Sequence, residues 1–355
     1  MDPIDQLMQQ ALIDKVFPGA VLLISQGGKM AFHKAYGFAD LFAGRVMTTG
    51  TVFDLASLTK PLATALAVMV LIAQNRLGLE LDLASVLPPF RNNEKSAVKI
   101  KHLLYHNSGL PDYRPYYMDL TNLPLGQRKK ALQNLLVQEP LIHSIGARVL
   151  YSDIGFMILA WLIEHVAAER LDQFVSKMIY APLGLDSLFF AGLNLTPSQE
   201  LFAATEKCPW RNKLVMGQVH DENAYVVGGV QGHAGLFGTA AAVQSLLLEL
   251  LSVYHGDSAS RVFQSDLVRL FFERLPNADR ALGFDMPAHN NSSAGKCFSP
   301  HTVGHLGFTG TSFWMDLERS IIVILLTNRI HPSRENEAIK VFRPKLHDAV
   351  MAGLL

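Results

Sequence analysis

The chain has 355 residues, and its 31 lysines and arginines equal its 31 aspartates and glutamates in number. Without an excess charge of either sign it has no general means of holding a polyanion or an anionic membrane, so neither nucleic acid nor a membrane is an expected partner. Apolar residues make up 49% of the chain and charged residues 17%, which excludes a disordered protein and predicts a large core. Because single cores stop growing near about 250–300 residues, two closely packed domains are expected.

The cysteines and the first residues bear on cellular location. Cys208 and Cys297 are far apart, and neither has a cysteine or histidine at zinc-ligand spacing, so neither a disulfide scaffold nor structural zinc is expected. The N-terminus has the pattern of an amphipathic helix and lacks the basic and apolar regions of a secretory signal. The longest apolar runs, 61–73 and 321–326, are too short to cross a bilayer. We therefore expect a cytoplasmic protein.

The first two thirds of the chain change from strand to helix periodicity. After the first helix, two strands at 20–25 and 29–37 flank Gly27-Gly28, which predicts a tight hairpin. From Pro61 to about residue 214 the pattern is helical, and no strand is predicted there. Two proline-containing loops, 84–98 and 108–126, are longer than usual connectors and are expected to line a site. Helices are predicted at 61–74, 127–138, 154–170 and 171–180.

Strands return near the C-terminus. Helices at 239–254 and 264–274 precede three strands with short turns, at 302–308, 311–317 and 320–328, and a last helix lies near 334–351. Since both ends of the chain supply strands, the sequence predicts an α+β fold: one antiparallel sheet built from both termini and flanked by helices. Residues 1–60 and 215–355 would form a discontinuous sheet domain, and 61–214 an inserted all-helical domain.

Several familiar catalytic motifs are missing. The 13 histidines contain no H-E-x-x-H pair, so no metal site is expected. The glycine-rich stretch 228–238 lacks the G-K-[ST] of a phosphate-binding loop, and the G-x-S-x-G of an α/β-hydrolase does not occur. The chemistry is therefore expected to need neither a metal nor a cofactor.

The motif S-x-x-K occurs three times and places a hydroxyl and an amine one helical turn apart, where the amine can help to remove the hydroxyl proton. A motif of two fixed positions arises by chance roughly once in a chain of this size, so its context must be considered. The pairs Ser96/Lys99 and Ser293/Lys296 lie in polar, turn-like segments typical of a solvated surface. Ser57/Lys60 opens a long apolar helix, with Pro61 in a first turn that tolerates proline.

Ser57 is thus the candidate nucleophile. At the start of a buried helix, a backbone N–H and the positive end of the helix would face whatever binds there. An alternative is that Ser57 serves only as the N-cap of this helix, because serine is among the preferred N-cap residues.

From this point the chain resembles a known family, the serine β-lactamases and penicillin-binding proteins, in their class C and esterase-like branch. The resemblance extends over nearly the whole chain. FDLASLTKPLATA (53–65) resembles the family's S-x-x-K segment, and HLLYHNSGLPDY (102–113) the block that follows it. YSDIGF (151–156) is similar to the Y-x-N motif, VHDENA (219–224) with GHAGLFGTA (232–240) to a stretch of the esterase-like members, and GHLGFTGTSFWMD (304–316) to the third motif.

The second motif has to be chosen among three tyrosines. Tyr105 and Tyr117 also precede an Asn or Asp by two residues, but Tyr105 belongs to the preceding block and Tyr117 to an aromatic loop. Tyr151 follows Ser57 at a distance similar to that in the family and precedes a strongly helical run, so the resemblance implies that it is catalytic. A buried tyrosine with a satisfied hydroxyl is the alternative.

Two positions depart from the β-lactamase pattern. The asparagine of the second motif is Asp153, whose carboxylate would favour the ammonium form of Lys60. The lysine of the third motif is His305, as in some carboxypeptidase and esterase-like members, and its imidazole is mostly neutral at neutral pH. By resemblance Asp153, His305 and Gly307 would bind the substrate, although His305 could instead be a core histidine. Efficient β-lactam hydrolysis is not expected.

The sequence therefore predicts a serine hydrolase that cleaves a small ester or amide through an acyl-enzyme on Ser57, with Lys60 and Tyr151 as its other catalytic residues. By resemblance, the backbone N–H groups of Ser57 and Phe308 would bind the oxyanion. The alternatives are a D-alanine carboxypeptidase or weak class C-type β-lactamase and, from a different class, a catalytically silent scaffold of the same fold. The oligomeric state is left open.

Overall fold

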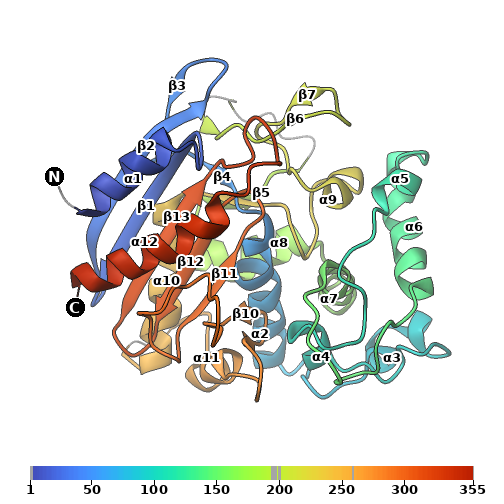
Figure 1. Cartoon of the computed structure of the whole chain (residues 1–355). Helices are drawn as coiled ribbons and strands as arrows, with labels where there is room; N and C mark the ends of the chain where they lie inside the picture. The colour runs from blue at the N-terminus through green and yellow to red at the C-terminus, as the bar shows by residue number, and fades with distance from the viewer. Residues whose placement is uncertain (1–2, 193–197, 199–200, 258–259, 355) are drawn as a thin grey trace.

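The two ends of the chain form one eight-stranded antiparallel sheet (Figure 1). The computed structural model describes residues 3–192, 198, 201–257 and 260–354. The strand order is β3-β2-β1-β13-β12-β11-β10-β9, so that β1 (Gly19–Gln26) lies beside β13 (Ile321–Thr327). The other strands are β2 (Lys29–Asp40), β3 (Arg45–Val46), β9 (Arg280–Ala281), β10 (Phe284–Asp285), β11 (Val303–Leu306) and β12 (Ser312–Asp316).

The predicted hairpin and the predicted C-terminal strands are both present. Gly27 and Gly28 connect β1 to β2 with φ values of +55° and +78°, a region of backbone conformation that favours glycine. Ala20 pairs with Thr327 and Gln26 with Ile321, which fixes the register between the two ends of the chain. Every residue of β13 is buried, because helices cover both faces of the sheet.

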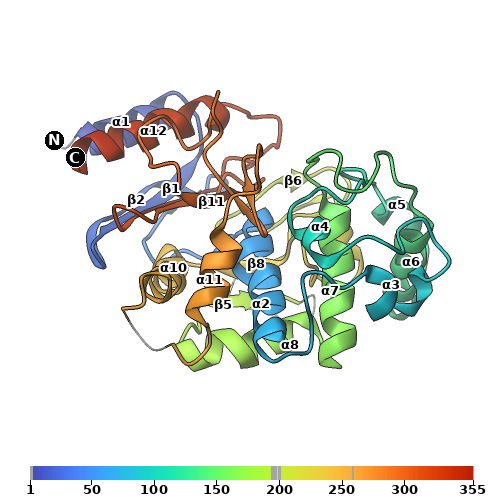
Figure 2. The same ribbon diagram turned by 90° about the horizontal axis from the view of Figure 1, so that it is seen from below.

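The helices form a layer on each side of the sheet (Figure 2). On one side α1 (Pro3–Ile13) and α12 (Ile339–Leu354) lie next to each other, and their apolar residues form a core with Trp314 and the outer side chains of β1 and β13. On the other side lie α2 (Leu66–Ala73), α10 (Ala240–His255) and α11 (Ser265–Phe272), which share the larger core. The fold is therefore α+β, as the sequence predicts.

The predicted helices of the middle segment are present and lie mainly at one end of the sheet (Figures 1 and 2). Both proline-containing loops, 84–98 and 108–126, include short helices of their own. The elements are α3 (Leu83–Val86), η3 (Pro88–Phe90), α4 (Ile100–Leu104), α5 (Tyr117–Leu120), α6 (Leu125–Gln138), α7 (Asp153–Ala167), α8 (Leu171–Val175), η4 (Ser176–Tyr180), η5 (Ala181–Leu183) and, beyond residue 214, α9 (Glu222–Val226).

The prediction that residues 61–214 contain no strand is wrong. β5 (Leu188–Phe190) pairs with β8 (Leu236–Gly238), which also pairs with β4 (Phe53–Asp54), and β6 (Lys207–Cys208) pairs with β7 (Lys213–Leu214). Strands of two or three residues are too short for an alternating pattern to be visible in the sequence. The small sheet β4-β8-β5 joins residues from before, within and after the predicted insertion.

The apolar helix after Ser57 is longer than the sequence suggested. A short 3₁₀ turn, η1 (Ala56–Leu58), and a π-helical segment, η2 (Lys60–Ala65), continue into α2, and together they make an 18-residue apolar helix, Ala56–Ala73. By length and composition alone this helix could cross a membrane, whereas the apolar run 61–73 was judged too short to do so. Within the protein 83% of it is buried, and it serves as a core helix.

Candidate active site

Ser57 lies at a strained turn between β4 and the core helix. The preceding residue, Ala56, has a φ of +48°, a left-handed conformation that is uncommon for a residue with a side chain. Asp54 supports this turn, because its carboxylate accepts the Ala56 N–H at 2.9 Å and the His220 N–H at 2.7 Å. The 3₁₀ turn begins after Leu55, so Ser57 is not its N-cap, and that alternative for the serine does not hold.

Lys60 is buried beneath Ser57 and carries several contacts. Its Nζ donates to Ser57 Oγ at 3.1 Å and to the His233 carbonyl at 3.2 Å, and it lies 2.7 Å from the Asp153 carboxylate. The Lys60 side chain is fully buried, which opposes its charge, yet the Asp153 carboxylate and Tyr151 outweigh this effect and raise the pKa of Lys60. The ammonium form of Lys60 is therefore the resting form at neutral pH.

Tyr151 brings its ring over the same ammonium. The Lys60 Nζ lies 4.8 Å from the centroid of the Tyr151 ring. The next residue, Ser152, is the N-cap of α7 through a hydrogen bond from Gly155 N–H, and its own N–H donates to Nδ1 of buried His106 at 2.9 Å. Burial raises the pKa of Tyr151 and outweighs the opposing effect of Lys60. At neutral pH the resting form of Tyr151 is therefore the neutral phenol, although the nearby ammonium favours phenolate.

A cavity of about 330 Å³ opens beside these groups. Of the two long loops that were expected to line a site, 108–126 contributes Tyr113, whereas 84–98 contributes nothing to this cavity. The residues around it are Ala56, Ser57, Tyr113, Tyr151, Asp153, His220, Asp221, Glu222, His233, Ala234, Phe308 and Arg334.

The alternative motifs do not reach this cavity. Of the three S-x-x-K pairs, only Ser57/Lys60 shows a bond from the lysine to its serine; Lys99 instead pairs with Glu80 at 2.8 Å. Of the three candidate tyrosines, Tyr151 alone lines the cavity with Ser57, and Tyr117 packs against Trp210. The structure thus brings together Ser57, Lys60 and Tyr151, as the sequence predicts.

Phe308 faces the cavity from the turn after β11. Two threonine hydroxyls bind this turn to the residues just before Ser57: Thr309 donates to the Asp54 carbonyl at 2.8 Å and Thr311 to the Leu55 carbonyl at 3.1 Å. In the described part of the chain no hydrogen bond from the Phe308 N–H is found. The arrangement leaves this N–H available beside Ser57, where the resemblance implies an oxyanion-binding group.

His305 and Gly307 are not placed to bind a substrate. His305 is 1% exposed, its Nδ1 bonds to the Leu306 carbonyl at 2.8 Å, and it does not line the cavity. Burial and nearby Lys60 lower its pKa well below the usual value, so it is neutral. The Gly307 N–H donates to Thr311, and a Cβ at Gly307 would lie 2.0 Å from Thr311 Oγ1. Gly307 therefore serves close packing, and the alternative of a core histidine describes His305.

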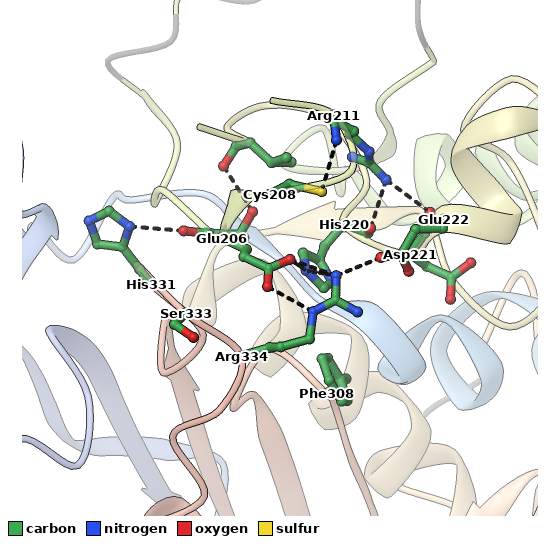
Figure 3. Close-up of polar contacts among 12 residues, drawn as sticks. Glu206, Cys208, Arg211, His220, Asp221, Glu222, Phe308, His331, Ser333 and Arg334 are labelled. Atoms are coloured by element: carbon green, nitrogen blue, oxygen red, sulfur yellow. Dashed lines mark hydrogen bonds and ion pairs between the residues drawn. The ribbon is translucent and has the colours of Figure 1, made fainter. Parts of the chain in front are cut away.

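A polar network that the sequence did not reveal forms one side of the cavity (Figure 3). The Arg334 guanidinium donates to both oxygens of Glu206, at 2.8 and 2.6 Å, and to Glu222 at 2.5 Å. His220 also contacts Glu206, at 3.0 Å. Although burial opposes it, these bonds from His220 and Arg334 lower the pKa of Glu206 to about 2. In sequence Arg334 lies 128 residues from Glu206, so only the fold brings them together.

The same region contains the one group of possible metal ligands found among the described residues. Side-chain ligand atoms of Glu206, Cys208 and Glu222 lie within 4.8 Å of one another. Both carboxylates are already bound by Arg334, whose charge occupies the position that a cation would need. The two cysteines, Cys208 and Cys297, are free thiols. These residues therefore do not form an open metal site.

A second network joins the two blocks, 219–224 and 232–240, that resemble a stretch of the esterase-like members. Asp221 in VHDENA is the N-cap of α9 and bonds to His233 of GHAGLFGTA, with 2.8 Å between Asp221 Oδ1 and His233 Nε2. The Arg280 guanidinium carbon lies 5.4 Å from the Tyr151 ring centroid, and Arg280 forms an ion pair with Asp285. Asp221 and His233 are 12 residues apart, whereas Arg280 and Tyr151 are far apart in the sequence and are brought together only by the fold.

An antiparallel sheet flanked by helices, with Ser57 above a buried lysine in a turn that contacts β11, is the arrangement of a serine hydrolase. The family model described as Beta-lactamase matches residues 4–343, and the chain belongs to this family. A protein of Escherichia coli (strain K12) named "Putative D-alanyl-D-alanine carboxypeptidase" is 31% identical, with 90% of this chain and 80% of that protein covered.

Two solved structures share the fold. EstCE1, described as a hydrolase with promiscuous acyltransferase activity, superposes with a TM-score of 0.76 at 24% identity, covering 98% of this chain and 97% of that one. The octameric penicillin-binding protein homologue from Pyrococcus abyssi also has a TM-score of 0.76, at 18% identity, covering 99% of this chain and 77% of that one. Similarity at this level concerns the fold, and the substrate has to be argued from the cavity.

Proposed function

We propose that this serine hydrolase cleaves small esters that carry no carboxylate, through an acyl-enzyme on Ser57. The observation that carries the proposal is the charge around the cavity, where three wall carboxylates, Asp153, Asp221 and Glu222, outnumber two cations, the Arg334 guanidinium and the buried Lys60 ammonium that is paired with Asp153. That guanidinium, Arg334, is already bound by two carboxylates. A substrate carboxylate would therefore enter a wall with an excess of negative charge.

Charge also bears on the alternative functions. In a D-alanine carboxypeptidase or a β-lactamase the substrate itself carries a carboxylate, which needs a cation in the site. The third-motif position that could supply one is the neutral, buried His305. Burial raises the pKa of the Tyr113 phenol at the cavity, and Asp221 and Glu222 act in the same direction. These groups favour a neutral or positively charged ester over an anionic peptide.

The reaction would proceed in two steps. Ser57 Oγ attacks the ester carbonyl, the Ser57 proton passes to Tyr151 in its minor phenolate form, and the resulting phenol returns a proton to the alcohol as it leaves. The N–H groups of Ser57 and Phe308 would stabilise the oxyanion, and each would lower the activation free energy by about 3–4 kcal/mol. Water then attacks the acyl group by the same route and releases the acid. Because the pKa values of Lys60 and Tyr151 are both raised, the basic form is scarce at neutral pH and the rate should increase with pH.

The test compares three substrates with the wild type and Ser57→Ala. p-Nitrophenyl acetate and p-nitrophenyl butyrate should be hydrolysed with a much higher kcat/KM than a chromogenic cephalosporin, and Ser57→Ala should abolish all turnover. A wild type that prefers the cephalosporin would overturn the substrate class. Ester hydrolysis that survives in Ser57→Ala would overturn the acyl-enzyme.

A further inference from the structure

The turn that presents the Phe308 N–H is held by two buried arginines. Arg343, from α12, donates through Nη2 to the Gly307 carbonyl at 3.1 Å and to the Thr311 carbonyl at 2.7 Å. Arg329, which follows β13, donates through Nε to the Phe308 carbonyl at 2.8 Å, and its guanidinium carbon lies 4.6 Å from the centroid of the Phe308 ring. Both carbonyls that flank the Phe308 nitrogen and α-carbon are thus bound by a guanidinium.

The bond from Arg343 acts on one particular peptide unit. The Gly307 carbonyl and the Phe308 N–H belong to the same planar amide, so a donor at the oxygen polarises the N–H at the other end. A positive charge at that position also favours negative charge that develops near the N–H. Arg343 therefore fixes the orientation of this amide and strengthens its N–H as a hydrogen-bond donor.

The charge of Arg343 is costly for the fold. The residue is 5% exposed, and among the described residues no carboxylate forms an ion pair with it. Burial lowers the pKa of Arg343 to about 9, and the like charge of Arg329 acts in the same direction. A buried cation without a counter-charge is unfavourable, and an apolar side chain of similar length would suit the core better. Packing alone therefore does not account for an arginine here.

The backbone around the turn is built to admit these side chains. Gly310 has a φ of +104°, and a Cβ there would lie 2.6 Å from Arg329 Cγ. The same Cβ would lie 2.0 Å from Thr327 Oγ1, so a side chain at this position would force Thr327 or Arg329 to move. The threonine bonds to Asp54 and Leu55 hold the opposite side of the same turn, so the position of Phe308 is fixed relative to Ser57 from two directions.

We propose that Arg343, together with Arg329, is a positioning residue that orients and polarises the Gly307–Phe308 amide for binding of the oxyanion. The inference rests on the proposed acyl-enzyme function, because it assigns a task to the N–H that would stabilise the tetrahedral intermediate. Arg343 touches neither the cavity nor the reacting atoms; it acts through the carbonyl of the amide that does.

The experiment measures hydrolysis of p-nitrophenyl acetate and inhibition by a small boronic acid, which forms an anionic tetrahedral boronate on the serine and places a boron-bound oxygen where the oxyanion would lie. In Arg343→Met we expect kcat/KM to fall by about 10- to 100-fold through kcat, and the affinity for the boronic acid to fall in parallel. Arg343→Lys keeps the charge and should recover part of both. Lys345→Met, an exposed charge on the same helix, is the matched control and should change neither.

The boronic acid separates this role from a merely structural one. A residue needed only for folding would lower the melting temperature and the amount of active enzyme, while the remaining active sites would bind the inhibitor normally. If Arg343→Met does not fold, Arg343→Gln replaces it, because its amide can donate to a carbonyl without a charge. Unchanged kcat/KM and inhibitor affinity in a folded variant would overturn the proposal, while the wild type remains an esterase. A wild type that neither hydrolyses esters nor becomes acylated would remove the proposed function, and this inference with it.

Discussion

Two cavities of the protein lie beside an S-x-x-K motif, and they differ in whether the lysine of that motif is exposed or buried. The larger one, about 770 Å³, lies between the 287–300 segment and α12 and includes Lys296, which is exposed. The smaller one, about 330 Å³, includes Ser57 above the fully buried Lys60. Neither the motif nor the volume distinguishes a reactive site from a surface hollow. Burial does, because it removes the water that would screen the ammonium from its neighbours.

The largest expected effect comes from replacing the serine of each motif, Ser57 or Ser293, by alanine. Ser57→Ala removes the only hydroxyl in contact with a buried ammonium at these motifs, so ester hydrolysis should fall by about 10⁴-fold or more. Ser293→Ala, in the motif beside the larger cavity, should leave the rate unchanged. Labelling with a fluorophosphonate probe checks both variants. Undiminished labelling of Ser57→Ala would show that another serine is the nucleophile.

The next effect concerns the proton acceptor. Tyr151→Phe keeps the ring over Lys60 and removes only the hydroxyl, so kcat should fall by about 10²–10⁴-fold while the melting temperature changes little. Single-turnover acylation by p-nitrophenyl acetate measures this step directly. If Tyr151→Phe retains most of its acylation rate and Lys60→Met abolishes it, the lysine is the base instead.

A smaller effect is expected in the pH dependence. Asp153 raises the pKa of both Lys60 and Tyr151, while burial acts on Lys60 in the opposite direction. In Asp153→Asn both pKa values should therefore decrease, so the rise of kcat/KM with pH should move to lower pH. The profile is measured against Asp119→Asn, an exposed carboxylate on α5. A rise at the same pH in both variants would contradict the assigned contact.

The smallest expected effect concerns the charge of the cavity wall. Methyl butyrate should be hydrolysed with a kcat/KM about tenfold higher than that for monomethyl succinate, which carries a carboxylate at the end of its acyl chain. Glu222→Gln can still accept a bond from Arg334 but removes one negative charge, and it should reduce this ratio a few-fold. Glu335→Gln, exposed nearby, is the control. Equal rates for the two esters in the wild type would refute the charge argument.

The sequence predicted those parts of the protein that leave a local pattern. The paired glycines of the first hairpin, the long apolar runs of β13 and α2 and the spacing of Ser57 from Lys60 are each visible within a few residues. Strands β4, β5 and β8 were missed because each has only two or three residues. His305 was expected at the substrate because its motif matched, but whether its side chain reaches the cavity depends on the fold.

The network around Arg334 could not be predicted either, because its residues are far apart in the sequence. Its partners Glu206 and Glu222 are 128 and 112 residues away in sequence, and no spacing rule connects such positions. The interaction of the Asp153 carboxylate with Lys60 could be predicted from the sequence, because both residues belong to motifs of the same family. The direction of the Tyr151 pKa shift could not be predicted, because it depends on burial that only the packed structure establishes.

The register between β1 and β13 has a consequence for synthesis of the protein. Val21 pairs with Leu326, so the partner of the first long strand is made only when nearly the whole chain has left the ribosome. Until then the edge of the N-terminal hairpin exposes unpaired backbone groups and the apolar side chains of β1, a combination that promotes aggregation. We expect nascent chains that end before residue 321 to depend on chaperones and to be sensitive to proteases, and full-length chains to become resistant to proteases once β13 has paired.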